Sequence, residues 1–386
     1  MQGPDYRGSS IVNLMSSIRV GLGLDAGLYP QLECLPGREL QDCRNLVLLV
    51  IDGLGFNHLR QAHPHSRLAA GLRVALSSVF PSTTASAVTS LFTGVGPQQH
   101  AISGWFMWLR ELGMVTSILP FRSRAGGLDL AAAGFEPGRL LGAPPLFDRL
   151  PVDSAIITEA WIADSPFSRA TAGRTPRIGY QQPAVLFERL LQRLHGGRGR
   201  QFTYAYWSEF DAMAHREGVA SRACAELLTE FDRLFAEFLA ACAGSDTRVL
   251  VVADHGFIDS GPAHYLLLED HPQLAECLAL PLCGEPRAAY CYVRPGREAA
   301  FERYVADVLD SYCELRRAED LIERGWFGLG EPHPQLARRV GDYVLLMKGR
   351  HVIKDYLSGE KPFFFTGVHS GLSEDEMRVP LIVADA

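Results

Sequence analysis

The sequence predicts an α/β fold with a mostly parallel central sheet flanked by helices. Short apolar runs that end in a small or polar residue are typical of buried parallel strands. Runs of this kind occupy residues 45–51, 73–80, 154–158, 202–207, 248–253 and 379–384. Helix-like patterns lie between them, and the clearest is 221–242, where apolar residues recur at spacings of three and four. Strands that alternate with helices in this way favour a parallel sheet covered on both faces.

Two segments interrupt the alternation. Residues of about 105–180 are rich in Gly, Pro, Arg and aromatic side chains, and we expect a loop-rich insertion there. Residues 261–365 have a strand–helix–strand pattern of their own, at 289–293, 297–311 and 342–347, which predicts a small inserted α+β cap. The predicted α/β core therefore comprises residues 1–260 and 366–386.

Composition limits the classes of function. The chain has 386 residues, a formal net charge of −7 and a pI of about 6.0, and it contains no long basic run, which argues against nucleic-acid binding. No apolar stretch is long enough to span a bilayer, and the N-terminus lacks the apolar core of a secretory signal. The eight cysteines are scattered without a CxxC pair, which favours free thiols over a disulfide framework. We therefore expect a cytoplasmic protein without membrane association; its oligomeric state is not indicated.

Acidic and histidine residues follow the strongest predicted strands. The candidates are Asp52, Asp211, His215, Asp254, His255 and His369. The carboxyl ends of parallel strands meet in one crevice, so residues far apart in the sequence can become neighbours there. Carboxylates and imidazoles without thiolates suit borderline or hard divalent metals, and the imidazoles favour zinc. The alternative for each residue taken singly is a helix cap or turn. We expect the nearby His58, His63 and His65 to be solvated surface histidines.

A candidate nucleophile lies in the segment Phe80-Pro81-Ser82-Thr83-Thr84, where a strand ends and a helix begins near Thr84. A hydroxyl at a helix N-terminus faces unpaired backbone N–H groups and the positive end of the helix dipole, which is a favourable position for phosphate. The alternative is a helix capped by Ser or Thr that has no chemical role.

Five segments that carry these residues, taken together, resemble the nucleotide pyrophosphatase/phosphodiesterase branch of the alkaline phosphatase superfamily. They are VLLVIDGLG, VFPSTTASAVTSLFTGVGPQQHAISG, YWSEFDAMAHREG, VVADHGF and TGVHSGLSEDEMRVPLIVA. They occur in the order found in the family, from about residue 47 to the C-terminus.

The resemblance implies a metal-dependent phosphohydrolase that cleaves phosphodiester or pyrophosphate bonds of small molecules through a phosphothreonine intermediate. It implies two Zn²⁺ ions, although other divalent metals are possible. One would be held by Asp52, Asp254, His255 and the nucleophile Thr84, and the other by Asp211, His215 and His369. The Ala85 backbone N–H would support negative charge on the phosphoryl group.

One departure from the family pattern concerns substrate binding. Characterised phosphodiesterases of this type carry an asparagine just after a His-Gly-Ile segment, whereas this chain reads His100-Ala101-Ile102-Ser103-Gly104-Trp105. Trp105 is a candidate for stacking on a base or aryl group, and core packing is the alternative. Phosphonate C–P hydrolysis and phosphomonoester hydrolysis at the same two-zinc site therefore remain open. An inactive metal-binding scaffold is the alternative from another class.

Overall fold

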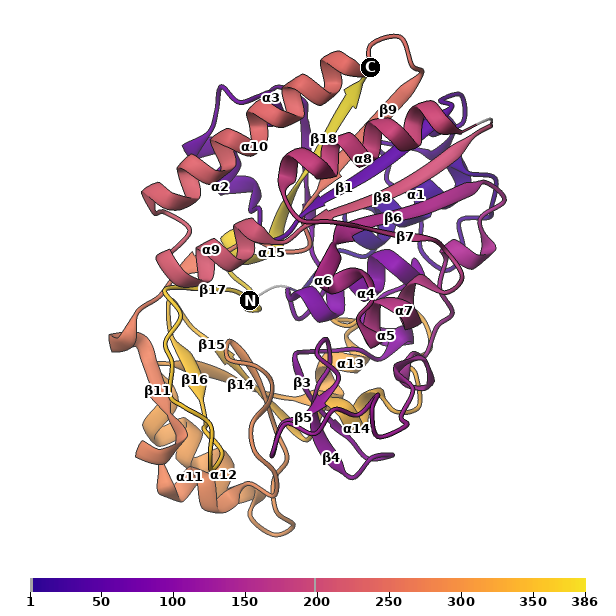
Figure 1. The fold of residues 1–386 in the computed structure, drawn as a ribbon. Coiled ribbons are helices and arrows are strands. Elements are labelled where there is room, and N and C mark those ends of the chain that lie inside the picture. Colours follow the sequence, from indigo (N-terminus) through magenta and orange to yellow (C-terminus); the bar gives the residue numbers. More distant parts are fainter. Residues whose placement is uncertain (1–2, 198) are drawn as a thin grey trace.

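The protein consists of two layers, each built on a seven-stranded sheet, as Figure 1 shows for the computed structural model. The structure describes residues 3–197 and 199–386. The central α/β layer holds the chain's largest hydrophobic cluster, and the second layer forms a cap beneath the carboxyl ends of the central strands (Figure 1).

The central sheet has the strand order β2-β18-β9-β1-β8-β6-β7. Its strands are β1 (Asn45–Ile51), β2 (Leu72–Ser77), β6 (Asp153–Glu159), β7 (Arg177–Tyr180), β8 (Gln201–Trp207), β9 (Thr247–Val252) and β18 (Arg378–Asp385). Strand β1 pairs in parallel with β8 and β9, and β18 runs antiparallel to β2 and β9. The predicted mostly parallel sheet is therefore confirmed.

Helices cover both faces of this sheet. All seven residues of β1 and of β8 are buried, as expected for central strands covered on two sides. Helices α3, α8 and α9 pack against α10 on one side, and α1 packs against α4 on the other (Figure 1). The helices of this layer are α1 (Ile11–Gly21), α2 (Phe56–Ala62), α3 (Arg67–Ala70), α4 (Thr84–Thr93), α5 (Pro97–His100), α6 (Ala160–Ala163), α7 (Pro166–Ala172), α8 (Pro183–Gly196), α9 (Glu209–Glu217), α10 (Arg222–Ala241) and α15 (Glu374–Met377).

The second sheet is antiparallel and has the order β14-β15-β13-β12-β3-β4-β5. Its strands are β3 (Phe106–Leu109), β4 (Met114–Ser117), β5 (Arg122–Ser123), β12 (Cys283–Glu285), β13 (Ala288–Cys291), β14 (Cys313–Arg317) and β15 (Tyr343–Met347). Helices α11 (Pro272–Cys277), α12 (Glu298–Tyr304), α13 (Ala318–Glu323) and α14 (Leu336–Val340) belong to this cap. Two small sheets join β10 (Ile258–Asp259) to β17 (Gly367–Val368) and β11 (Tyr265–Leu267) to β16 (Val352–Lys354).

The segment expected to be a loop-rich insertion is divided between the two layers. Strands β3, β4 and β5 join the cap sheet, whereas β6 and β7 complete the central sheet. The junction is formed where β3 pairs with β12, with Phe106 opposite Gly284. A Cβ atom on Gly104 would lie only 2.8 Å from the Gly284 Cα, so the two backbones meet at a distance that favours glycine. The predicted helix at 297–311 is α12 followed by a π-helical turn at Val305–Leu309.

Within the residues that the structure describes, none of the helices combines the length and the apolarity that crossing a membrane requires.

Candidate active site

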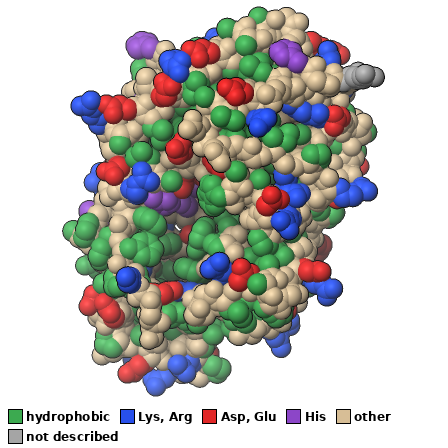
Figure 2. Space-filling view, viewed as in Figure 1, with side chains coloured by type: hydrophobic (Ala, Val, Ile, Leu, Met, Phe, Trp, Pro, Cys, Tyr) green, Lys and Arg blue, Asp and Glu red, His purple; other side chains and the backbone are tan. Residues whose placement is uncertain are grey.

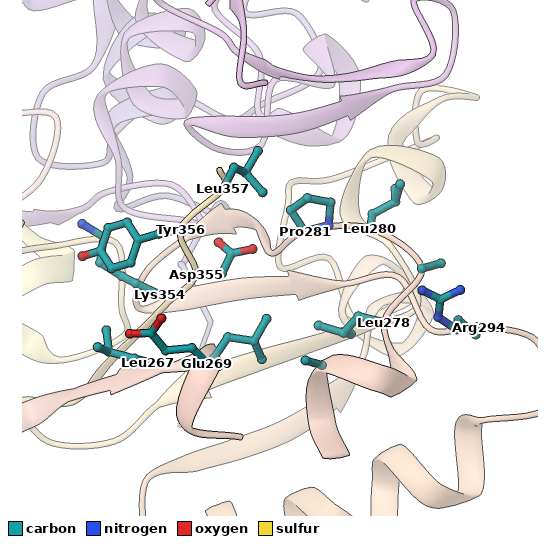
Figure 3. Close-up of a pocket in the computed structure, with 13 residues that line it drawn as sticks. Leu267, Glu269, Leu278, Leu280, Pro281, Arg294, Lys354, Asp355, Tyr356 and Leu357 are labelled. Carbon is teal, nitrogen blue, oxygen red and sulfur yellow. The ribbon is translucent and has the colours of Figure 1, made fainter. Parts of the chain in front are cut away.

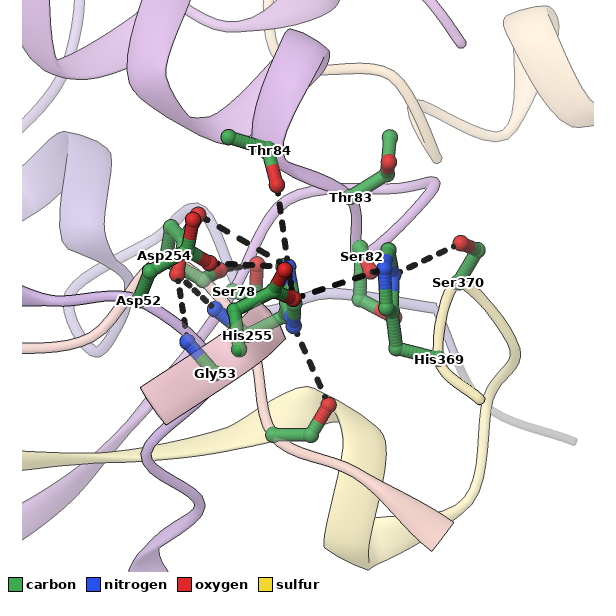
Figure 4. Close-up of polar contacts among 12 residues, drawn as sticks. Asp52, Gly53, Ser78, Ser82, Thr83, Thr84, Asp254, His255, His369 and Ser370 are labelled. Carbon is green, nitrogen blue, oxygen red and sulfur yellow. Dashed lines mark hydrogen bonds and ion pairs between the residues drawn. The ribbon is translucent and has the colours of Figure 1, made fainter. Parts of the chain in front are cut away.

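Thr84 is the first residue of helix α4, at the junction of the two layers. The N-cap residue Thr83 does not cap the helix with its side chain. Its hydroxyl instead donates to Glu285 Oε1 at 2.7 Å, across the boundary between core and cap. The helix is therefore not capped by a threonine side chain. The half-buried Thr84 hydroxyl faces the strand ends (Figure 4).

The Ala85 backbone N–H lies in the first turn of α4, and no acceptor for it is found among residues 3–197 and 199–386. Unpaired N–H groups at a helix start, together with the helix dipole, stabilise a bound anion.

Asp52, Asp254 and His255 lie together at the carboxyl ends of β1 and β9 (Figure 4). His255 Nε2 is 3.3 Å from Asp52 Oδ1, 3.7 Å from Asp254 Oδ2 and 3.2 Å from Thr84 Oγ1. The side chains of these two aspartates and of His255 are almost completely buried. One imidazole nitrogen therefore faces two carboxylates and the candidate nucleophile.

Asp211, His215 and His369 form the neighbouring part of the site. Asp211 and His215 lie one turn apart on α9, and His369 follows β17. Asp211 Oδ1 is 3.5 Å from His215 Nε2 and 3.9 Å from His369 Nε2. It is also 3.9 Å from His255 Nε2, and the His255 and His369 rings stack with centroids 3.8 Å apart. All seven predicted ligand residues are thus brought into one contiguous cluster.

The donor atoms of this cluster fit divalent metal ions. Two groups of potential ligands have their donor atoms within 4.8 Å of one another: Asp52, Asp254 and His255, and Asp211, His255 and His369. His255 belongs to both groups, whereas the sequence assigned it to the first alone and placed His215 in the second.

Three buried carboxylate oxygens in the cluster have no hydrogen-bond donor among the described residues. They are Asp52 Oδ1, Asp211 Oδ1 and Asp254 Oδ2. Buried acceptors of this kind are costly unless a donor or a cation pairs with them. A cation between these oxygens would satisfy all three.

The histidine tautomers point to the same conclusion. The Nδ1 atoms of His215, His255 and His369 lie 2.9–3.2 Å from the carbonyl oxygens of Gly367, Gly256 and Ser82. A carbonyl can only accept, so each Nδ1 carries the proton and each Nε2 presents a lone pair to the carboxylates. Backbone carbonyls that fix the far nitrogen of an imidazole are a usual outer layer of metal sites.

The pKa values of the Asp52 carboxyl and of the His369 imidazole are shifted in this crowded, buried site. Burial, followed by repulsion from Asp254 and Asp211, raises the pKa of the Asp52 carboxyl well above its ordinary value. Burial lowers the pKa of His369 well below its ordinary value, and the neighbouring His255 and His215 add to the shift. Both shifts disfavour the charged forms of the two side chains. Bound cations would lower the pKa of the Asp52 carboxyl again, because they stabilise its negative charge.

Two cavities flank Thr84. One has a volume of about 550 Å³ and is lined by Asp52, Arg122, Trp161 and Tyr206 among others. The second has a volume of about 460 Å³ and is lined by His215, Glu285, Lys354 and His369 among others. Thr84, Trp105 and Asp211 line both. In the space-filling view of Figure 2, a hollow rimmed by hydrophobic side chains opens beside histidine side chains. A further cavity of about 410 Å³ in the cap is lined mainly by apolar side chains and by none of the predicted site residues (Figure 3).

The family profile described as type I phosphodiesterase / nucleotide pyrophosphatase matches residues 46–370, which include all of these site residues. The chain belongs to the type I phosphodiesterase/nucleotide pyrophosphatase family. It is accordingly a member of the alkaline phosphatase superfamily and a hydrolase that acts on phosphoester bonds. No curated protein matches the sequence at a significant level.

Solved structures share the fold of this family member. Murine ectonucleotide pyrophosphatase/phosphodiesterase 5 superposes with a TM-score of 0.65 at 16% identity, over 87% of each chain. Phosphonoacetate hydrolase from Sinorhizobium meliloti 1021, in complex with phosphonoformate, superposes with a TM-score of 0.65 at 17% identity, over 88% of this chain and 90% of the other.

This phosphodiesterase-family chain has a site residue, Glu285, that the sequence did not reveal. Glu285 ends cap strand β12, is 6% exposed, and accepts hydrogen bonds from the Thr83 hydroxyl and from the Trp105 N–H, both at 2.7 Å. Burial raises the pKa of its carboxyl to about 7. No sequence motif includes Glu285. It lies next to Thr83 because strand β12 pairs with β3, a long-range contact that the local sequence does not show.

The segment without the family asparagine runs along the same junction. Trp105 is 36% exposed and lines both cavities, so it faces the site and is not packed in the core. The neighbouring Phe106 and Trp108 are partly buried and pack against a hydrophobic cluster of the cap.

Tyr206 is another residue that the sequence analysis did not single out. Its hydroxyl donates to Asp52 Oδ2 from the neighbouring strand β8. The alternation of inward side chains along this strand could have indicated it, because Tyr206 lies opposite Val50 in the parallel register.

The prediction of solvated histidines after Asp52 was wrong for two of the three. His58 and His63 are half-buried, and their ring centroids lie 5.7 Å apart, with His58 also against Phe210. Burial lowers the pKa of His58 to about 4, with the His63 charge adding to the shift. Only His65 is exposed. Packing of α2 on the sheet, which the local sequence does not show, explains the difference.

Proposed function

We propose that this protein is a metal-dependent phosphodiesterase or nucleotide pyrophosphatase that acts on small molecules, with Thr84 as the nucleophile. The observation that carries the proposal is the pair of cavities that Thr84 lines. A diester or pyrophosphate has a substituent on each side of the reacting phosphorus, and each cavity has room for one of them. A monoester would leave one cavity without a substituent.

The proposed reaction has two steps, and each site residue has its own role. Thr84 Oγ1, after its proton is lost to water, attacks phosphorus. The bond from phosphorus to the leaving oxygen breaks, that oxygen takes up a proton from water, and a phosphothreonine forms. Water then attacks this phosphorus and regenerates the Thr84 hydroxyl. The Ala85 N–H and the start of α4 bind a non-bridging oxygen as negative charge develops.

We propose Asp52, Asp254, His255 and Thr84 as ligands of one divalent ion and Asp211, His215 and His369 as ligands of a second, with zinc as the metal. Such ions supply the positive charge that favours the Thr84 alkoxide and the departing oxygen. Tyr206 orients Asp52, and the carbonyls of Gly367, Gly256 and Ser82 orient the three histidines. Carboxylates and imidazoles without a thiolate suit borderline or hard divalent metals, and the imidazoles support zinc among these.

The aromatic wall of the 550 Å³ cavity supports a substrate with a flat organic group. Trp105, Trp161 and Phe167 line this cavity, and Trp161 is 77% exposed on α6. Rings of this kind stack on a base or an aryl group. Among the described residues, the eight cysteines are free thiols, which supports function in a reducing compartment such as the cytoplasm.

The test is hydrolysis of three chromogenic esters by zinc-loaded protein, with an EDTA control. Bis-p-nitrophenyl phosphate and the p-nitrophenyl ester of thymidine 5′-monophosphate are diesters, and p-nitrophenyl phosphate is the monoester. EDTA-sensitive cleavage of the diesters at the higher kcat/KM is expected. A preference for the monoester, or cleavage of none of the three, would contradict the proposal.

Phosphonate C–P hydrolysis is the second candidate. Trp105 stands in the segment where the family asparagine is missing, and its N–H is bound to Glu285. The phosphoryl contacts of a diester are therefore altered at this position, and phosphonates are the next substrates to test if the diesters are not cleaved.

A further inference from the structure

Lys354 lies at the end of β16 and carries its charge into a group of aromatic rings. Its Nζ is 3.5 Å from the centroid of the Phe363 ring, 5.3 Å from that of Phe365 and 5.7 Å from that of Tyr356. An ammonium group is attracted to ring faces at such distances. The chain has 37 Lys and Arg residues, of which only Lys348, Lys354 and Lys361 are lysines, and the last two line the 460 Å³ cavity.

The Lys354 charge has no partner of opposite sign within the described part of the chain. No carboxylate lies within ion-pair distance of its Nζ there. The two nearby carboxylates are held by Arg124, which lies 2.7 Å from Asp355 and 3.1 Å from Glu360. Burial lowers the pKa of Lys354 to about 8, and the Arg124 charge adds to the shift. The ammonium is thus mostly protonated at neutral pH yet largely desolvated, a state that an anion would stabilise.

The aromatic group connects Lys354 to the site around Thr84. The Phe365 ring lies 4.9 Å from Phe363 on one side and 4.3 Å from the His215 ring on the other, by centroids. Lys354 lines the same cavity as Thr84, His215 and His369. The unpaired cation and the His215 ring therefore both lie beside the Phe365 ring, in a cavity that Thr84 and His369 also line.

We propose that Lys354, held by the rings of Tyr356, Phe363 and Phe365, forms a subsite for a second anionic group of the substrate, a carboxylate or a phosphate. It would bind that group while the reacting phosphoryl lies at Thr84. This rests on the proposed function, because it takes the phosphoryl position from Thr84 and the predicted metal ligands. It defines a substrate class: compounds with a negative charge a few bonds from the phosphorus on the side of His215 and His369.

The test measures binding and does not depend on turnover. Three ligands share one phosphonate head and an ethylene spacer and differ only in the far group: propylphosphonate (methyl), 3-phosphonopropionate (carboxylate) and ethane-1,2-bisphosphonate (phosphonate). Isothermal titration calorimetry gives their dissociation constants for zinc-loaded wild-type protein and for Lys354→Met, Lys354→Arg and Lys348→Met. Lys348 is a matched control because it lies 3.8 Å from Asp310 and does not line the cavity.

We expect wild-type protein to bind at least one charged ligand about tenfold more tightly than propylphosphonate, which corresponds to one close charge pair. Lys354→Met abolishes this advantage while changing propylphosphonate affinity less than twofold; Lys354→Arg keeps most of it, and Lys348→Met all of it. The stronger of the two charged ligands identifies the group as carboxylate or phosphate.

Equal affinity of wild-type protein for the three ligands, or binding of none, overturns the subsite, and this comparison needs no variant to fold. Survival of the advantage in folded Lys354→Met also overturns it. Failure of the proposed function is separate, since it appears as a lack of ester hydrolysis whatever the binding constants.

Discussion

Arg287 and Glu376 form a buried, bidentate ion pair that joins the cap to the core. Arg287 Nε lies 2.6 Å from Glu376 Oε1, and Nη2 lies 2.9 Å from Oε2. Glu376 Oε1 also accepts from the Gly371 N–H at 2.7 Å. The pair therefore ties the turn between β12 and β13, next to Glu285, to the loop that carries His369.

Removing one partner of this pair should destabilise the protein strongly. Arg287→Met leaves the Glu376 carboxylate buried without its counter-ion, and we expect a loss of about 3–5 kcal/mol in the free energy of unfolding. Urea denaturation followed by tryptophan fluorescence measures it. Arg222→Met, which removes an exposed partner of Glu226, is the control and should leave stability essentially unchanged. Similar stabilities for the two variants would show that the ion pair does not hold the layers together.

Thr84→Ala should abolish turnover and leave the zinc content near two per chain, because the aspartates and histidines remain to hold the metal. The measurements are hydrolysis of the p-nitrophenyl ester of thymidine 5′-monophosphate and elemental analysis of the purified variant. Thr83→Ser is the control: it keeps a hydroxyl for Glu285 and should retain most activity. If Thr84→Ala kept more than a few percent of wild-type activity, the nucleophile would lie elsewhere, with Thr83 the first suspect.

Asp254→Asn and His369→Ala should each lower metal occupancy. The first change replaces a carboxylate by a neutral amide and the second removes an imidazole, each in one of the two groups of potential ligands. Zinc content after dialysis, determined by elemental analysis, gives the result directly. His65→Ala, on an exposed histidine, should bind as much zinc as wild-type protein. Wild-type zinc levels in both ligand variants would refute the assignment.

Glu285 should make the stability of the metal-free protein depend on pH. Because burial raises the pKa of its carboxyl from 4.5 to about 7, the folded protein keeps this proton where the unfolded chain has lost it. The stability it contributes is fully present below pH 4.5 and is lost as the pH rises to about 7, by about 3 kcal/mol at most.

Glu285→Gln should remove this part of the pH dependence while still accepting hydrogen bonds from Thr83 and Trp105. The measurement is unfolding of EDTA-treated wild-type and variant protein at pH 5 and pH 8. Both proteins contain the other buried carboxyls, so the difference between them isolates Glu285. Glu319→Gln, on the exposed face of α13, is the control and should follow wild-type protein. Parallel curves for wild type and Glu285→Gln would rule out the raised pKa.

Much of the central layer and the cluster of site residues could be predicted from the sequence alone. Asn45–Ile51 is an uninterrupted apolar run and forms β1 with the predicted bounds, because a strand covered on both faces needs apolar side chains at every position. Asp52 and Asp254 follow such runs directly, and the convergence of parallel strand ends brings them together. These features depend on local periodicity and on chain topology, which a single sequence contains.

Only the tertiary structure decided the cap side of the site. Glu285 and Lys354 lie in short strands without a distinctive pattern. The position of Glu285 follows from the antiparallel pairing of β12 with β3, and that of Lys354 from the parallel pairing of β16 with β11. Pairing partners in an antiparallel sheet are chosen by long-range contacts, and here the backbones of Gly104 and Gly284 must approach closely. The sequence alone therefore determined the family, the predicted nucleophile and the predicted metal ligands. The packing of the cap decided which charges face the substrate, since that depends on contacts between segments about 180 residues apart.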